Sequence, residues 1–167
     1  SEALKNQLIE YHEIFSDIEL YAIDDYLPSI ITCDLIIYSS QISYDEIQIL
    51  DVSIRSKEKI IAYRTIDFSR LDKLVRLKKN EQVLVVNDTM ETTVNIIDHL
   101  QAIGLEDVNF VPYYPGIDFN RAIKTAVTPG ELHLIPEGIE KVVDIGPRLF
   151  DYSTVFGILE VVGVNQD

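Results

Sequence analysis

The stretch VLVVNDTMETTVNIIDHLQAIGLEDVNFV, residues 83–111, decides the fold class of this chain. Two short runs rich in β-branched residues, 83–86 and 108–111, enclose a segment with apolar residues at helical spacing. Asp88 is expected to cap this helix with Glu91 as its capping-box partner, and Gly104 is expected to end it. A strand, a helix and a second strand in this order predict a right-handed crossover between two parallel strands.

Further apolar segments extend this alternation over the rest of the chain. We expect strands over 19–23, 35–38, 59–63, 125–127 and 142–145, whereas 47–54 fits either a strand or a short helix. Asp118 is expected to cap a short segment ending at Ile123, and Ser153 to cap a last helix. The predicted apolar helix faces are Leu4, Leu8, Tyr11 and Phe15; Phe68, Leu71, Leu74 and Val75; Thr93, Ile96, Ile97, Leu100 and Ile103; and Val155, Ile158, Leu159 and Val162.

These elements predict an α/β fold with Rossmann-like parallel sheets and flanking helices, divided into two small lobes with a cleft. A chain of 167 residues suits one domain or two small lobes. The polar stretch Lys78–Glu81 separates two periodic segments. We therefore expect a first α/β lobe over 1–79, a second over 80–150 and a C-terminal connector helix over 151–167.

The charge of the chain argues against nucleic acid as a direct partner of this segment. The net charge is −14, whereas binding to a phosphate backbone needs a basic face. One cluster of basic residues fits the solvated face of a single helix: Arg70, Lys73, Arg76, Lys78 and Lys79. No apolar run approaches the roughly 20 residues that cross a bilayer, and no signal peptide opens the chain. With Cys33 as its one cysteine, the chain is expected in the cytoplasm.

The residues that usually carry catalysis do not form a recognisable set in this sequence. Neither a Walker-type nor a dinucleotide-binding glycine pattern occurs. Cys33 has no neighbouring histidine, and the spacing of His12, His99 and His133 matches no zinc motif. Of the three histidines, His133 is the only candidate for facing a pocket, because it lies near the 128–131 loop. We therefore expect no catalytic residue, no metal and no cofactor.

Acidic residues at predicted strand ends suggest a receiver-like domain as an alternative. Asp24, Asp25, Asp88 and Asp144 hold such positions. A receiver also needs an aspartate after its third strand and a lysine after its last, and these are missing here. Asp88 is moreover explained as a helix cap.

Ligand binding at the strand ends is the remaining chemistry. In open α/β sheets, ligands bind beyond the carboxyl ends of the strands. In the first half these ends carry Ser39, Ser40, Arg64 and Thr65; in the second half they carry Asn87, Asp88, Thr89, Tyr113, Tyr114, Thr128, Gly130 and Arg148. Arg64 and Arg148 could hold a carboxylate or phosphate through paired hydrogen bonds. Alternatively, each arginine bridges to the aspartate three residues away, Asp67 or Asp151.

The amino-acid sequences of four loops resemble those of a family of bacterial regulators. The stretches are 83–89 (VLVVNDT), 111–116 (VPYYPG), 128–131 (TPGE) with 136–138 (PEG), and 143–146 (VDIG). They are similar to the amino-terminal input regions of Gram-positive sigma-54-dependent transcriptional activators and, more distantly, to the input region of the propionate-catabolism regulator. The resemblance covers about residues 59–160. It implies two Rossmann-like lobes with a ligand cleft, followed by PAS and AAA+ modules, with the last helix as connector.

The sequence thus predicts a non-catalytic, cytoplasmic input domain for signal transduction in transcription regulation. It would bind a small anionic effector between two lobes and change the pose of the last helix. Because the chain begins on a helix, we expect it to be part of a longer regulator. Alternatives are a self-association module, with a homodimer formed through a sheet edge or the last helix, and a small α/β enzyme.

Overall fold

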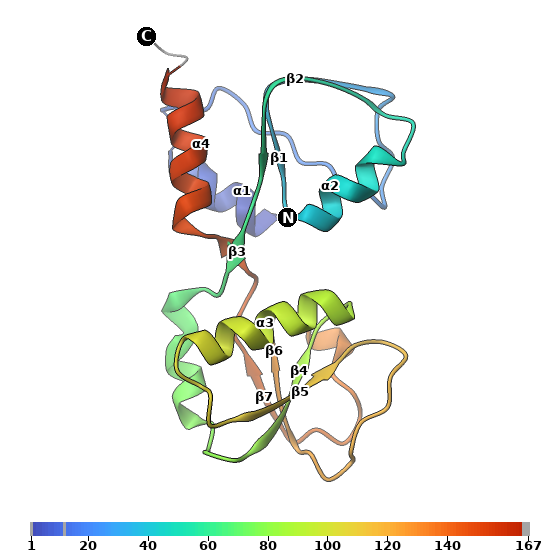
Figure 1. Ribbon diagram of the computed structural model, residues 1–167, viewed down its shortest axis with the longest axis vertical. Coiled ribbons are helices and arrows are strands. Elements are labelled where there is room, and N and C mark those ends of the chain that lie inside the picture. Colours follow the sequence, from blue (N-terminus) through green and yellow to red (C-terminus); the bar gives the residue numbers. More distant parts are fainter. Residues whose placement is uncertain (1, 12, 165–167) are drawn as a thin grey trace. The chain divides into compact units, whose positions relative to one another are not determined.

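The computed structural model describes residues 2–11 and 13–164, and His12 lies outside the described residues. The chain forms two compact units, one of Ser1–Thr65 with Leu149–Asp167 and one of Ile66–Arg148 (Figure 1). Both are mixed α/β units with parallel strands and flanking helices, which confirms the predicted fold class. Within the described residues, no helix is both long enough and apolar enough to span a membrane.

The second unit contains a four-stranded parallel sheet. Its strands are β4 (Gln82–Val86), β5 (Asn109–Tyr113), β6 (Thr125–Thr128) and β7 (Lys141–Asp144), in the order β5-β4-β6-β7. Helix α3 (Met90–Ala102) links β4 to β5, as predicted, and these two strands are parallel. Two 3-10 helices complete the unit, η1 (Phe68–Arg76) and η2 (Leu132–Leu134).

The apolar run in β4 is buried on both sides of the sheet. Val83 and Val85 pack in a cluster with residues of α3 and η1, among them Ile96 and Leu74. Leu84 and Val86 pack in a second cluster with Ala126 and with residues of the loops before and after β6. A central parallel strand covered on both faces gains from an apolar side chain at every position, which explains the unbroken run.

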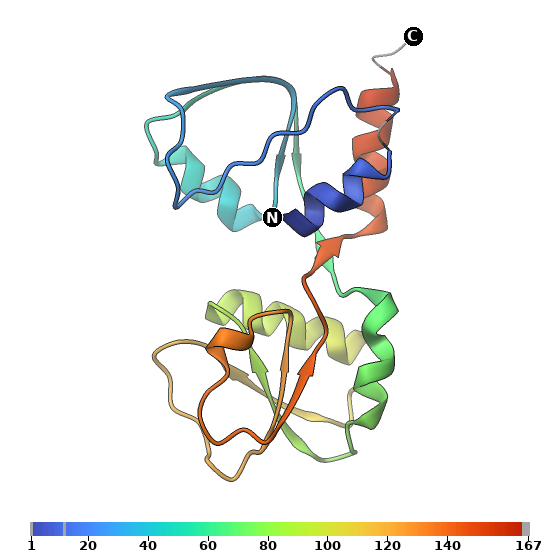
Figure 2. The ribbon, with the colours of Figure 1, turned by 180° about the vertical axis from the view of Figure 1, so that it is seen from behind.

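The first unit has a smaller sheet. Its elements are α1 (Glu2–Ile9), β1 (Ile30–Tyr38), α2 (Gln41–Gln48), β2 (Ser53–Ile61), β3 (Arg64–Thr65), β8 (Leu149–Phe150) and α4 (Tyr152–Val164). Strands β1 and β2 are parallel, whereas β3 and β8 form a two-residue antiparallel ladder. Figure 2 shows α1 beside α4, and both contribute to one apolar cluster with Leu35 and Ile37 of β1.

The compact units do not follow the predicted lobe boundaries. The predicted boundary falls at 79/80, whereas the chain leaves the first unit after Thr65 and returns to it at Leu149. Helix η1 belongs to the second unit because Leu74 is buried in that unit's core. Helix α4, the predicted connector, belongs to the first unit because Val155 and Ile158 are buried in its core. The second unit is thus an insertion between β3 and β8.

Several predicted elements differ from the structure. Residues 19–23 form no strand; Leu20 and Tyr21 stay substantially exposed, so their side chains gain little from an extended pairing. The segment after Asp118 is not helical. The ambiguous stretch 47–54 spans the end of α2 and the start of β2. In η1, Phe68 and Val75 are exposed, because a 3-10 helix has three residues per turn and cannot hold all four predicted apolar residues on one face.

Two of the three predicted helix caps, Asp88 and Ser153, are displaced by one or two residues. Thr89, not Asp88, caps α3: its hydroxyl accepts a 3.2 Å hydrogen bond from Thr92 N, and Thr89 N donates back to the Thr92 hydroxyl at 3.3 Å. Asp88 supports this cap by accepting a 2.6 Å hydrogen bond from the Thr92 hydroxyl. At the start of α4, Asp151 rather than Ser153 accepts a 2.8 Å hydrogen bond from Thr154 N. Gly104 follows α3 with φ +105°, as predicted.

Candidate functional site at the carboxyl edge of the second sheet

The four strands of the second unit all end at one edge of the sheet, because each is parallel to its neighbours. The loops that follow are joined by backbone hydrogen bonds. Asn87 N donates to Tyr113 O at 3.2 Å, and Ile145 N donates to Thr128 O at 2.9 Å. The structure therefore brings together the predicted residues that end or follow β4, β5 and β6, namely Asn87, Asp88, Thr89, Tyr113, Tyr114, Thr128 and Gly130.

The centre of this edge is a topological switch point. From β4 the chain passes to β5 on one side, and the next strand, β6, lies on the other side of β4. Ligands of open α/β sheets bind where the strand order reverses in this way. Asn87 and Thr128 follow or end the two strands that flank the switch point, and both residues are buried.

The Asn87 amide is the most informative polar group at the switch point. The residue is 7% exposed, and its side chain makes no hydrogen bond to another described residue. Its amide atoms are not fully buried, so they can meet water or a ligand at this edge. Thr128, in contrast, is satisfied within the protein: its hydroxyl accepts a 3.0 Å hydrogen bond from Glu131 N.

Two glycines allow a close approach at the β6 and β7 ends. Gly130 has φ +92°, and a Cβ there would lie 3.6 Å from Pro147 N, so the loops after β6 and β7 are in contact. Gly146 has φ +71°, and a Cβ there would lie 2.6 Å from Cζ of Arg70. The Arg70 guanidinium therefore lies directly against the backbone that follows β7.

Helix η1 delivers Arg70 to this edge. Lys141 at the start of β7 donates to Arg76 O at 3.3 Å, whereas Lys73 donates to Asp144 O at the strand's end at 2.9 Å. The helix therefore runs antiparallel to β7, with Arg76 at the amino edge and Arg70 at the carboxyl edge. Sequence reasoning assigned these cations to a solvated helix face. Their three-residue spacing, which aligns side chains on a 3-10 helix, was the available signal.

Asp67 helps to fix Arg70. Its carboxylate lies 3.5 Å from Arg70 Nε and accepts hydrogen bonds from the hydroxyl and the backbone N of Ser69. The Ser69 hydroxyl is the largest cause of a lowered Asp67 pKa, and the charge of Arg70 lowers it further. Asp67 therefore stays ionised and orients one side of the guanidinium.

The other predicted arginines lie elsewhere. Arg148 Nη2 donates to Asn95 Oδ1 and lies 3.4 Å from His99 Nδ1, so its side chain runs along α3. Arg64 belongs to β3 of the first unit, where it lies opposite Phe150. These two arginines are therefore not part of the group of residues at the carboxyl edge of the second sheet.

The remaining predicted residues have local partners. Ser40 caps α2 by accepting a 3.1 Å hydrogen bond from Ser43 N, and the Ser39 hydroxyl lies 3.0 Å from that of Ser43. Thr65 pairs with Leu149 in the β3–β8 ladder. Tyr113 packs edge-on against Phe119, with ring centroids 5.4 Å apart. The His133 side chain is 73% exposed and lies 3.6 Å from Glu131, so it lines no pocket wall.

Two shallow hollows in the described part of the chain lie in the first unit. The residues described by the structure also contain no group of three or more side chains placed to hold a metal ion. The edge offers an amide without a protein partner, backbone groups of four loops and one guanidinium, a set suited to recognising a small anion.

Comparisons with family models, with curated proteins and with solved structures give no match for this chain.

Proposed function

We propose that this chain is a sensory input domain that binds a small anionic metabolite at the carboxyl edge of the second unit's sheet. The observation that carries the proposal is the Asn87 amide at the switch point of the described sheet, which makes no hydrogen bond to another described residue and stays accessible to a ligand. Asn87 hydrogen-bonds the ligand, and Arg70 supplies the positive charge from the β7 side. The side chains involved carry amide, hydroxyl and guanidinium groups. Such groups favour recognition of a ligand over catalysis of a reaction.

The loop resemblance supports a role in transcription regulation. In this proposal the chain is the input region of a cytoplasmic, sigma-54-dependent regulator, and PAS and AAA+ modules follow it in the full-length protein. Effector binding changes the output only by its differential affinity for two conformations of the regulator. The effector must therefore bind more tightly to the active or to the inactive form.

Isothermal titration calorimetry against acetate, succinate, citrate and glycerol 3-phosphate tests the binding step. Arg70→Met and Asn87→Ala should each weaken the tightest interaction about tenfold, which corresponds to one good hydrogen bond or ion pair, ~1.4 kcal/mol. Arg76→Met is the matched control, because it removes the same charge from the same helix at the opposite edge. Equal losses in Arg70→Met and Arg76→Met, or no binding of any of these anions, would contradict the proposal.

Self-association through α4 is a second candidate function. Tyr152 and Phe156 are spaced four residues apart on one helical face and are 79% and 62% exposed. Glu160, one turn further along the same face, is also exposed, so a contact with a second copy of this acidic chain has to use the first two turns of α4. Light scattering at increasing protein concentration, with Phe156→Ser as the variant, decides whether a dimer forms there.

A further inference from the structure

We infer that the first unit carries a separate binding site, for a small carboxylate with an apolar body, in the hollow between α2 and the β1–β2 sheet. The hollow has a volume of about 310 Å³ and is open to solvent. This is the lower end of the size range of small-molecule pockets, roughly 300–1,000 Å³. Its main walls are Ile36, Tyr38, Tyr44, Ile47, Leu50 and Lys59.

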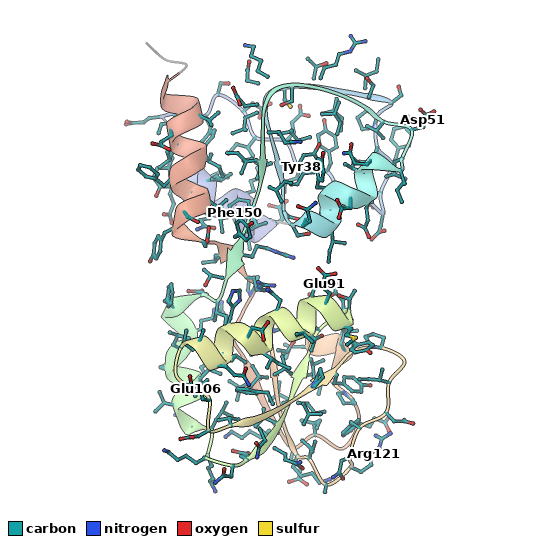
Figure 3. All side chains as sticks on the ribbon, in the orientation of Figure 1. Tyr38, Asp51, Glu91, Glu106, Arg121 and Phe150 are labelled. Atoms are coloured by element: carbon teal, nitrogen blue, oxygen red, sulfur yellow. The ribbon has the colours of Figure 1, made fainter. Side chains whose placement is uncertain are left out.

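The hollow exists because the two faces of this sheet are packed differently. On one face, Leu35, Ile37 and Ile60 pack against the apolar cluster formed with α1 and α4. On the other face, α2 is the covering helix, and it buries Ile47. In Figure 3, Tyr38 lies between the strands and α2. Its ring meets that of Tyr44 edge to face, with centroids 5.0 Å apart, and the two rings form an aromatic wall.

A cation is held beside this wall. Lys59 Nζ lies 4.5 Å from the centroid of the Tyr44 ring and donates a 3.2 Å hydrogen bond to the Tyr44 hydroxyl. Within the described residues, Lys59 forms no ion pair with a carboxylate. Its ammonium group therefore retains donors for an anionic ligand, and the tyrosine keeps it in place.

A hydroxyl donor completes the site. Tyr38 is 8% exposed and lines the hollow, yet its hydroxyl has no hydrogen-bond partner among the described residues. Burial raises the pKa of Tyr38, although the nearby Lys59 opposes this effect, so the phenol stays protonated at neutral pH and can donate. A dry packing defect is lined by apolar atoms. The exposed lining of this hollow is more polar than apolar, and Lys59 and the accessible Tyr38 hydroxyl contribute to it beside the aliphatic side chains.

These groups define the class of ligand. A carboxylate accepts from Lys59 and from the Tyr38 hydroxyl, and an aromatic or branched body contacts Ile36, Ile47 and the tyrosine rings. The net charge of −14 opposes binding of any anion at long range, so we expect a dissociation constant near 1 mM for a small probe. The site shares no residue with the carboxyl edge of the second sheet and does not depend on the function proposed there.

Benzoate, and benzamide as its neutral counterpart, are the probes. Titration of the full chain, followed by NMR, should shift the amide signals of residues around the hollow, and benzamide should bind at least fivefold more weakly. Lys59→Met should lower benzoate affinity at least fivefold and Tyr38→Phe about threefold. Lys57→Met is the matched control, since Lys57 lies on the same strand, pairs with Asp34 and does not line the hollow. The benzoate affinity of this variant should change less than twofold.

Two further outcomes separate this site from the one in the second unit. Arg70→Met should leave benzoate binding unchanged; if it abolishes binding, the carboxylate site is the edge of the second sheet and the inference is overturned. The absence of benzoate binding at 10 mM, or equal losses in Lys59→Met and Lys57→Met, would also overturn it. If Lys59→Met fails to fold by circular dichroism, the comparison of benzoate with benzamide on the unaltered chain decides the question.

Discussion

The Thr125 hydroxyl donates a 2.6 Å hydrogen bond to Glu81 Oε1 and so ties together the amino ends of β6 and β4. The other carboxylate oxygen of Glu81 accepts a 2.9 Å hydrogen bond from Lys78 N. The two central strands are thus clamped at the edge opposite the candidate site. Such a clamp holds the strands in register while the loops at the carboxyl edge adapt to a ligand.

The Glu81 clamp should make stability depend on pH. The Thr125 hydroxyl, followed by the Lys78 amide, lowers the pKa of Glu81 in the folded protein. A carboxyl group with a lowered folded pKa contributes stability above its unfolded pKa, near 4.3, and this contribution is lost as pH falls through the folded pKa. Glu81→Gln should therefore lower the free energy of unfolding at pH 7, and its difference from the unaltered chain should shrink toward about pH 3.5.

Urea unfolding at a series of pH values measures this difference. Glu106→Gln is the control, because Glu106 is an exposed glutamate without a hydrogen bond to another described residue. A Glu81→Gln effect that stays constant from pH 7 to pH 3.5 would show that the carboxylate charge does not stabilise the clamp.

The contact between Arg70 and Gly146 can be isolated with a pair of glycine substitutions. Gly146→Ala places a Cβ in a left-handed backbone and 2.6 Å from the guanidinium, whereas Gly116→Ala meets the same backbone penalty with no atom within 4 Å. We expect each substitution to cost about 1 kcal/mol through its left-handed backbone, because the atoms that a Cβ at Gly146 would meet belong to the flexible end of the Arg70 side chain and can shift. Gly146→Ala alone should weaken anion binding, because Arg70 must move. Equal anion affinities for the two variants would argue against the contact.

The cap of α3 gives a third prediction. Thr89→Ala removes the hydroxyl that accepts from Thr92 N and should destabilise the chain by about 1 kcal/mol. Glu91→Gln should change stability by less than about 0.5 kcal/mol, because Glu91 is exposed and takes no part in the capping box. Chemical unfolding of both variants provides the measurement. The reverse order would favour the capping pair of Asp88 and Glu91 that the sequence suggested.

The fold of the second unit was largely predictable, because its strands are buried on both faces. The runs 83–86 and 125–127 contain little besides apolar residues, and each coincides with a strand. The first unit was harder. Strand β2, with the sequence SIRSKEKII, is half exposed and rich in charge, so only its apolar end suggested a strand. No local sequence pattern indicates β3 and β8 either, since each strand has only two residues and the two strands are separated by 83 positions in the chain.

The candidate site was predictable to the level of strand ends and no further. Once the strands of the second unit are parallel, Asn87, Tyr113 and Thr128 must lie at one edge. Which cation reaches that edge depends on tertiary contacts. Arg70 belongs to η1, which runs beside β7, and its side chain lies against Gly146. Arg148 follows β7 in sequence, but its side chain lies along α3. Side-chain partners of this kind are set by packing that a one-dimensional pattern does not contain.

The last helix provides the sharpest test of the division into units. Ile158 is fully buried in the core of the first unit, so Ile158→Ala should cost about 2–5 kcal/mol. Phe156 lies two residues away and is 62% exposed, so Phe156→Ala should lower the free energy of unfolding by less than about 1 kcal/mol. Gly157→Ala should stabilise the chain by about 0.5–1 kcal/mol, because the added Cβ meets no neighbouring atom within 4 Å and alanine favours the helix. Thermal unfolding distinguishes these cases. If Ile158→Ala is as mild as Phe156→Ala, α4 is a connector that the first unit does not need, and the sequence-based boundary at 151 is the better description.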